Sequence, residues 1–184
     1  MTNSTTVLTA IGTFILGALV AFGADRYVFK TTDQRDKMET IAAFQGWRLT
    51  CPPRTVKSAN CIMQQALARK GTGTILAELN IAPDKNKTDV MTVIAPLGVF
   101  VLPGVKVSAG NSGEKIVPYK TCVQMGCVAT LPIDAGLAAA MSRSRNIQVT
   151  VAADGKAVPI NFSLNGYRDA LAARAVDMAA RSKQ

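Results

Sequence analysis

Four cysteines are the residues of this chain whose type and spacing most readily do chemistry: Cys51, Cys61, Cys122 and Cys127. An even set of cysteines in a short exported domain is typical of a disulfide framework. Among the three connectivities open to four cysteines, the short separations favour Cys51 with Cys61 and Cys122 with Cys127. The sequence therefore predicts two structural disulfides, the second of them across a tight turn.

Zinc binding and redox chemistry are the alternatives for these cysteines. Cys51 and Cys61 stand too far apart in the sequence for a normal zinc knuckle, and the chain has no histidine to complete a ligand set. A redox pair is typically a Cys-x-x-Cys motif, which the sequence lacks. We therefore expect no metal and no other cofactor.

The absence of histidine removes the usual general base and proton shuttle. Most of the 12 carboxylates fall near the N-terminal segment or at predicted turns and helix starts, where capping explains them. Glu78, Glu114 and Asp177 remain, and no pair of them has a spacing that indicates acid-base catalysis. We predict a protein that is not an enzyme and has no small-molecule substrate; an envelope enzyme that uses Glu78 or Glu114 is the alternative.

The chain carries a formal charge of +9, which suits anionic lipid or an acidic protein surface. Two groups of basic side chains are candidates for such a surface. The first group, at one end of a predicted hairpin, is Arg143, Arg145 and Lys156, and the second, on the final helix, is Arg168, Arg174, Arg181 and Lys183. Nucleic acid is not an expected partner, because aromatic residues are not interleaved with these bases.

The first 24 residues are predicted to be a membrane anchor. Residues 7–24 are eighteen positions without a charge, close to the length of about 20 that a transmembrane helix needs. A cleaved signal peptide is the alternative, since Ala21-Phe22-Gly23 offers small residues to a peptidase. The anchor is favoured because no Lys or Arg precedes Val7, whereas a signal peptide normally begins with positive charge.

Small residues recur every four positions along this segment, at Thr9, Thr13, Gly17 and Ala21. Such a stripe lets two membrane helices approach closely, so we expect it to pack on an inner-membrane protein complex.

Two arguments disagree about the orientation of the protein in the membrane. Bases that follow the helix place the domain in the cytoplasm by the positive-inside rule, whereas the paired cysteines place it in the periplasm. We follow the cysteines and expect a single-pass protein with its C-terminal domain in the periplasm.

Residues 25–43 read as a charged helical stalk, and residues 44–184 as one β-rich domain. Short alternating runs separated by turns predict an antiparallel β-sandwich or a barrel-like fold. The expected strands are 47–51, 61–68, 74–81, 90–95, 105–108, 115–123, 127–131, 147–152 and 157–164. Asp134 is expected to cap a short helix over 135–142, and Asn165 an amphipathic C-terminal helix over 166–181.

An apolar run, residues 99–102, lies between two turn-forming segments, Pro96-Leu97-Gly98 and Pro103-Gly104. Its composition predicts a buried strand. The alternative is an exposed hydrophobic edge that binds a partner.

Several of these segments together resemble the invasion-associated locus B family, small exported proteins of alphaproteobacteria. The matching segments are Phe44-Gln45-Gly46-Trp47 before Cys51, Cys61 with Gln64, Ala95-Pro96-Leu97-Gly98, Leu102-Pro103-Gly104, Cys122 with Gly126-Cys127, and Leu164-Asn165-Gly166-Tyr167. They span about residues 44–172. The resemblance implies an envelope location, a β-rich fold with paired cysteines, and a virulence phenotype with no defined chemistry.

Together these features predict a membrane-anchored periplasmic accessory protein, a small subunit that packs on an inner-membrane complex. The alternative is a secreted or surface-exposed factor that acts in host-cell invasion, as the family resemblance implies. The two differ in whether residues 1–24 are retained.

Overall fold

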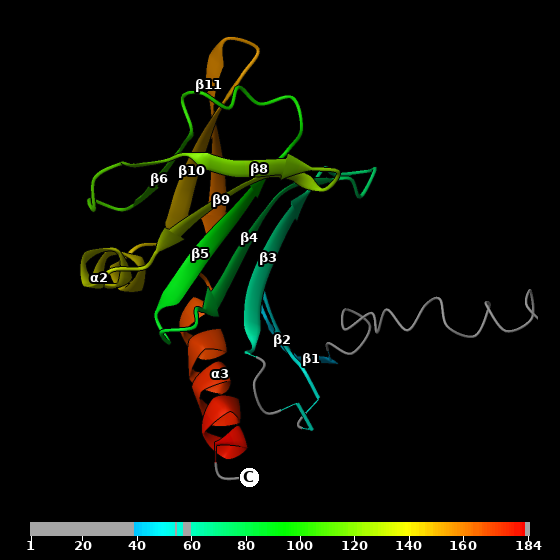
Figure 1. Ribbon diagram of the computed structural model, residues 1–184, viewed down its shortest axis with the longest axis vertical. Helices are drawn as coiled ribbons and strands as arrows, with labels where there is room; N and C mark the ends of the chain where they lie inside the picture. The colour runs from blue at the N-terminus through cyan, green and yellow to red at the C-terminus, as the bar shows by residue number, and fades with distance from the viewer. Residues whose placement is uncertain (1–38, 54, 57–59, 183–184) are drawn as a thin grey trace, which may run out of the picture. The chain divides into compact units, whose positions relative to one another are not determined.

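The alternation of apolar and polar side chains becomes two antiparallel sheets in the computed structural model, which describes residues 39–53, 55–56 and 60–182 (Figure 1). The larger sheet has the order β1-β2-β3-β4-β5-β9-β8, and the smaller sheet β11-β10-β6-β7. Strands of the larger sheet are β1 Glu39–Phe44, β2 Trp47–Cys51, β3 Ile62–Ala68, β4 Ile75–Pro83, β5 Asp89–Ala95, β8 Tyr119–Val123 and β9 Gly126–Pro132. Strands of the smaller sheet are β6 Val105–Ala109, β7 Lys115–Val117, β10 Asn146–Ala153 and β11 Lys156–Ser163. The predicted mainly β, antiparallel fold is confirmed.

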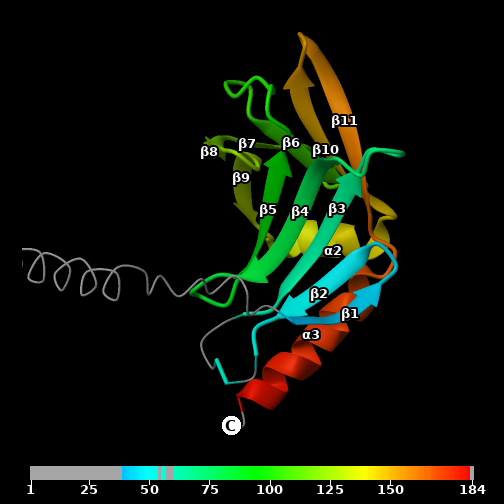
Figure 2. The ribbon, with the colours of Figure 1, turned by 90° about the vertical axis from the view of Figure 1, so that its right-hand side faces the viewer.

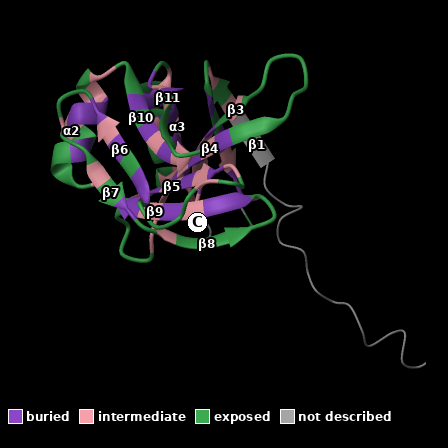
Figure 3. Cartoon of the chain, turned by 90° about the horizontal axis from the view of Figure 1, so that it is seen from above, coloured by how far each residue is buried: buried purple, intermediate pink, exposed green. Residues whose placement is uncertain are grey.

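One hydrophobic core lies between the two sheets. In most strands every second side chain points into it, as the buried Leu79 and Ile81 of β4 and Val105 and Val107 of β6 illustrate, whereas β8 and β11 are mostly exposed. Figure 3 shows buried stretches on strands of both sheets. Each fully buried Val, Leu or Ile stabilises the fold by about 1.5–3 kcal/mol, so this alternation selects which face of each strand is covered.

Helix α2, Ala135–Arg143, begins where the sequence predicts it. The Asp134 carboxylate caps it by accepting a hydrogen bond of 2.8 Å from the backbone N–H of Leu137. The ammonium group of Lys115 lies 2.5 Å from the same carboxylate and, with the helix amides, lowers the pKa of Asp134. The apolar side of α2 buries Leu137 and Met141 in the core.

Helix α3, Tyr167–Arg181, packs on β1, β2 and β3 of the larger sheet (Figure 2). The predicted cap at Asn165 is wrong: the residue before the helix is Gly166, with φ of 78° and no side-chain cap. A Cβ atom at Gly166 would lie 2.3 Å from the Phe44 carbonyl oxygen, so only glycine fits this close approach. The rings of Trp47 and Tyr167 then meet with centroids 5.4 Å apart.

Two predicted boundaries are corrected. The domain begins with β1 at Glu39, so the predicted stalk is wrong over residues 39–43, which pair with β2. The sequence feature that indicates this additional strand is Gln45-Gly46, the two-residue turn that pairs Phe44 with Trp47. The single strand predicted over 115–123 is two strands, because Pro118 has no N–H and the chain crosses there from the smaller to the larger sheet. Residues 25–38 of the stalk lie outside the described residues.

Candidate functional site

The disulfide between Cys51 and Cys61 lies in the core, where it joins the end of β2 to the start of β3. The Cys61 sulfur is 3.3 Å from the Asp177 carboxylate on α3. This sulfur has no proton to donate, so the approach is a packing contact. Arg181 donates hydrogen bonds to Asp177 and, over 2.7 Å, to the Pro52 carbonyl oxygen. Disulfide, carboxylate and guanidinium together hold α3 on this end of the sheet, which we call the entry end because the chain enters the domain here.

The two cysteines of this disulfide and Asp177 could also be considered as metal ligands. In the described part of the chain, Cys51, Cys61 and Asp177 are the one group whose potential metal-ligating atoms lie close together. A metal ion binds cysteine through a free thiolate. Both sulfurs of this group belong to the disulfide, so in the oxidised protein the group stabilises the structure.

The second disulfide joins Cys122 of β8 to Cys127 of β9 and closes the turn between these strands. Unlike the first, it has one exposed cysteine, Cys122. The turn lies against the end of β5, because a Cβ atom at Gly126 would be 2.3 Å from the Ala95 carbonyl oxygen. The disulfide thus fixes the position of an exposed side chain in the turn, Met125.

The buried strand predicted over residues 99–102 is wrong. These residues form a loop between β5 and β6, in which Phe100 is 53% exposed, Val101 47% and Leu102 98% (Figure 1). The backbone N–H of Phe100 donates to the Ala152 carbonyl oxygen at 2.8 Å, and the N–H of Gly104 to that of Val101 at 3.0 Å. The turns on either side leave too few residues to form a paired strand, so the loop is held by one hydrogen bond to β10 and one of its own, and the apolar side chains face water.

A hollow of about 300 Å³ lies where the chain leaves β5, at Pro96, before this loop begins. Its apolar lining includes Ile75 and Leu76 at the start of β4, Pro96 after β5, and Met125 in the β8–β9 turn. We call this surface the apolar end, made up of Ile75, Leu76, Pro96, Leu97, Phe100, Val101, Leu102 and Met125. An exposed apolar patch typically marks a site of protein or membrane contact.

The apolar end and the entry end lie at opposite ends of β3. The strand pairing places Glu39 beside Cys51, where β3 begins, and Ile75 beside Ala68, where β3 ends. At about 3.3 Å per residue, a strand of this length spans about 20 Å. The point where the chain enters the domain is therefore about one strand length away from Ile75.

Glu78 and Glu114, the carboxylates of the enzyme alternative, are not brought together. The Glu78 carboxylate, on β4, accepts hydrogen bonds from the side-chain amides of Gln64 at 2.6 Å and Asn80 at 2.7 Å. Glu114 precedes β7 in the smaller sheet and lies 3.1 Å from the ammonium group of Lys106. Each carboxylate has its own partners, and the two do not form an acid-base pair.

The predicted gathering of Arg143, Arg145 and Lys156 is wrong. Lys156 pairs with Ala153 at the tip of the β10–β11 hairpin, whereas Arg143 and Arg145 lie at its base, where Asn146 pairs with Ser163. The hairpin itself separates them, because its strands are extended over their whole length.

The predicted basic face of the final helix is also wrong in part. The Arg174 guanidinium is buried 2.5 Å from the Asp89 carboxylate, and Arg181 is paired with Asp177. These two arginines hold α3 in place. Arg168 is exposed, and Lys183 lies outside the described residues.

The predicted membrane-helix residues, Thr9, Thr13, Gly17 and Ala21, lie outside the described residues. Among the residues that the structure does describe, neither helix has the length and apolar character needed to cross a bilayer.

Sequence reasoning missed Ile75, Leu76 and Met125 as members of a surface. A signal was present, because Ile75-Leu76 places large apolar residues on both faces of a strand directly after the Gly71-Thr72-Gly73 turn. Met125, between two cysteines in a turn, is likewise an apolar residue at a position that faces solvent.

Three kinds of comparison with known proteins give consistent matches. Residues 47–175 match the family described as invasion associated locus B (IalB) protein. Invasion protein B homologs of Brucella abortus strain 2308 and of Brucella abortus biovar 1 strain 9-941 are each 30% identical over 133 residues, 70% of this chain and 75% of the relative. The crystal structure of invasion associated protein B from Bartonella henselae matches with a TM-score of 0.64 and 17% identity, over 78% of this chain and 97% of that chain.

The family match covers most of the domain, including β2 to β11 and most of α3. The Bartonella structure shows that the fold is shared, and the Brucella relatives show that the sequence likeness extends over most of both chains. The resemblance read from the sequence is therefore confirmed, and the chain belongs to the invasion associated locus B family.

Proposed function

We propose that this protein is a non-enzymatic binding protein of the bacterial cell envelope, which binds a partner protein through the apolar end. The observation that carries the proposal is the loop between β5 and β6, where Leu102 is 98% exposed beside the half-exposed Phe100 and Val101. Exposing these side chains to water is unfavourable. A partner that covers Leu102 recovers about 1.5–3 kcal/mol, and one that covers the half-exposed Phe100 or Val101 about half as much for each. Aromatic and aliphatic side chains of this kind form the energetic centre of protein interfaces.

The apolar end also has a defined shape, as a binding surface requires. The disulfide at Cys122 and Cys127 fixes the turn that carries Met125, and the hydrogen bond from Phe100 to Ala152 fixes the loop. Side chains held in place lose less conformational entropy on binding. The non-enzymatic part of the proposal is supported by the absence of histidine and by the separate engagement of Glu78 and Glu114.

In the proposed arrangement, residues 1–24 anchor the protein in the inner membrane, with the domain in the periplasm as a small subunit of a membrane complex. The support is the uncharged segment 7–24 and its stripe Thr9, Thr13, Gly17 and Ala21, together with the paired cysteines. Replacing Gly17 and Ala21 with Leu is expected to abolish co-purification with the membrane complex. Unchanged co-purification would refute this packing.

A secreted or surface-exposed factor is the second candidate, favoured by the family description as invasion associated. The intact mass of protein purified from native membranes, alkylated without reduction, separates the two. A mass that includes residues 1–24 with no alkylated thiol supports the anchored periplasmic arrangement. Loss of those residues supports secretion, and four alkylated thiols would support a cytoplasmic domain.

Site-specific photo-crosslinking in cells tests the apolar end directly. We would place the crosslinking residue at Leu102, at Met125, and at Ala175 as a control, because Ala175 is exposed on α3. The expected result is the same adduct from Leu102 and Met125, none from Ala175, and loss of the adduct when Phe100→Ser is added. Identical adducts at all three positions, or no adduct at the two apolar positions, would refute the proposal.

A further inference from the structure

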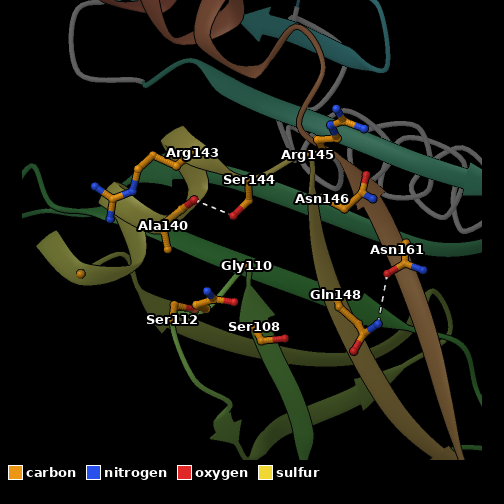
Figure 4. Close-up of a pocket in the computed structure, with 12 residues that line it drawn as sticks. Ser108, Gly110, Ser112, Ala140, Arg143, Ser144, Arg145, Asn146, Gln148 and Asn161 are labelled. Atoms are coloured by element: carbon orange, nitrogen blue, oxygen red, sulfur yellow. Dashed lines mark hydrogen bonds between the residues drawn. The ribbon is translucent and has the colours of Figure 1, made fainter.

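A polar cleft of about 720 Å³ lies between α2 and the outer face of the smaller sheet (Figure 4). Its floor is formed by Ser108 of β6, Gln148 of β10 and Asn161 of β11, and Asn111 stands in the turn after β6. Arg143 and Arg145 stand at its rim on either side of Ser144 (Figure 4). A cleft of this volume is in the range of small-ligand sites, and it is separate from the apolar end.

The cleft carries uncompensated positive charge. Neither Arg143 nor Arg145 has a carboxylate partner among the described residues, and no carboxylate lines the cleft. The carboxylates of Glu114 and Asp134, on the neighbouring segments, are already paired with Lys106 and Lys115. Among the described residues, no carboxylate therefore competes with a ligand for the hydrogen-bond donors of these two guanidinium groups.

The end of α2 at this rim does not offset that charge. Carbonyl groups at a helix C-terminus carry partial negative charge when they lack partners. Here the Ser144 hydroxyl donates to the Ala140 carbonyl oxygen at 2.7 Å, and the Arg168 guanidinium donates to that of Ser142. These bonds give the Ala140 and Ser142 carbonyl groups partners from within the protein, which reduces the negative charge that the helix end presents to the rim.

The walls of the cleft are formed in advance of any ligand. The turn that carries Asn111 is closed by two hydrogen bonds, from the Ser112 N–H to the Ala109 carbonyl oxygen at 3.0 Å and from the Ala109 N–H to the Ser112 hydroxyl at 3.1 Å. A Cβ atom at Gly110 would lie 2.4 Å from the Ser144 hydroxyl oxygen, so this turn lies directly against the end of α2. The Asn111 side chain has no hydrogen-bond partner in the described part of the chain and is left to bind a ligand.

From this geometry we infer that the cleft binds an anionic oligosaccharide, a sugar chain that carries sulfate, phosphate or carboxylate groups. Guanidinium groups at the rim bind such anions through paired hydrogen bonds, and the hydroxyl and amide side chains of the floor suit sugar hydroxyl groups. The polar lining disfavours an apolar ligand. No aromatic side chain lines the cleft, so it offers no stacking surface for a nucleotide base.

Isothermal titration calorimetry on the full chain in a neutral detergent tests this inference. The probes are a sulfated hexasaccharide of uronic acid and glucosamine, of the kind outside a host cell, and a phosphorylated glucosamine disaccharide, of the kind in a bacterial envelope. The double variant Arg143→Gln with Arg145→Gln is expected to weaken binding of the preferred probe at least about ten-fold, as loss of charge-assisted hydrogen bonds implies.

The matched control is Arg69→Gln with Lys70→Gln, which removes the same charge from the exposed turn between β3 and β4. It is expected to change the affinity less than about two-fold, because neither residue lines the cleft. Binding of either probe with this dependence supports the inference, and the preferred probe identifies the source of the sugar.

Three outcomes would overturn the inference: equal weakening by both double variants, no binding of either probe, or tighter binding of a hexaglutamate peptide with the same arginine dependence. The first would indicate general attraction to a basic protein, and the last an acidic peptide site. None of these outcomes bears on the apolar end, which the probes do not contact.

Discussion

The entry end and the apolar end differ in which side chains they bury and which they expose. At the entry end, the side chains of Asp177 and Arg181 are only 8% and 7% exposed, and they lie paired beside a buried disulfide. At the apolar end, Leu102 is 98% exposed and the disulfide at Cys122 is open to solvent. A stable fold alone favours the first arrangement, because it buries apolar atoms and pairs charges. Stability of the fold therefore does not explain the composition of the apolar end.

The two disulfides provide the most direct test of this comparison. Replacing Cys51 and Cys61 with Ala is expected to lower the free energy of unfolding by about 4 kcal/mol. Without this disulfide the unfolded chain gains entropy, and the core loses two buried sulfurs. The sequence separation is 10 for this pair and 5 for the other. Replacing Cys122 and Cys127 is therefore expected to lower it by only about 2 kcal/mol. Urea unfolding measures both losses, and a larger loss at the exposed pair would contradict the comparison.

The buried pair at the entry end is the next largest effect. Arg181→Met leaves the Asp177 carboxylate and the Pro52 carbonyl group without this donor in a covered site, at an expected loss of about 3 kcal/mol. Arg143→Met is the matched control, because Arg143 is exposed and unpaired, and its loss is expected within about 0.5 kcal/mol. Urea unfolding of the two variants compares them. Similar losses would mean that Arg181 contributes no more than a surface residue.

The entry end shows how far the sequence predicts the structure. The cysteine separations alone favour the pairing that the structure has, because short loops restrict which sulfurs meet. The roles of Arg174 and Arg181 were not predictable in the same way. Asp89, the partner of Arg174, and Pro52, one of the two partners of Arg181, are far away in the sequence. Asp177, the other partner of Arg181, is only four residues away, but a basic residue on an amphipathic helix usually faces solvent.

The apolar end shows where composition misleads. Val99 to Leu102 has the composition of a buried strand, but the turns at both of its ends decide the outcome. The polar cleft could not be predicted from the sequence either, because it joins α2 to β6, β10 and β11, and the pairing of β10 with β6 brings together strands that are far apart in the sequence. Sequence periodicity indicates which face of a strand is covered; which strands become neighbours depends on tertiary contacts.

The loop itself provides the contrasting prediction of a small effect on stability. Replacing Phe100 and Leu102 with Ser is expected to lower the free energy of unfolding by about 1 kcal/mol, because Leu102 is already in water and Phe100 is half-exposed. The same double variant is expected to remove the photo-crosslinked adduct at Met125. Urea unfolding and the crosslinking gel together separate folding from binding. A stability loss above about 1.5 kcal/mol would mean that the loop packs on the domain and is no free surface.

The smallest expected effect concerns an exposed ion pair, which gives the scale for the buried pair at the entry end. The Lys115 hydrogen bond, the Leu137 amide and the Lys115 charge hold the pKa of Asp134 below its ordinary value of 3.8. A lowered pKa means that the folded state binds a proton less readily than the unfolded chain. The stabilisation is therefore present above about pH 4 and disappears as the pH falls through the lowered pKa.

Asp134→Asn is accordingly expected to lower the urea midpoint at pH 7, with a gap to the unmodified protein that closes in acid. Lys115→Met removes the first cause of the shift. In a protein that carries Lys115→Met, adding Asp134→Asn should therefore give a smaller gap, and this gap should close closer to pH 4. Unfolding curves between pH 7 and pH 2.5 measure both gaps. A gap that stays constant over this range would show that the cap acts through geometry alone. An exposed pair would then contribute nothing by its charge, and the contrast with Asp177 and Arg181 would be sharper still.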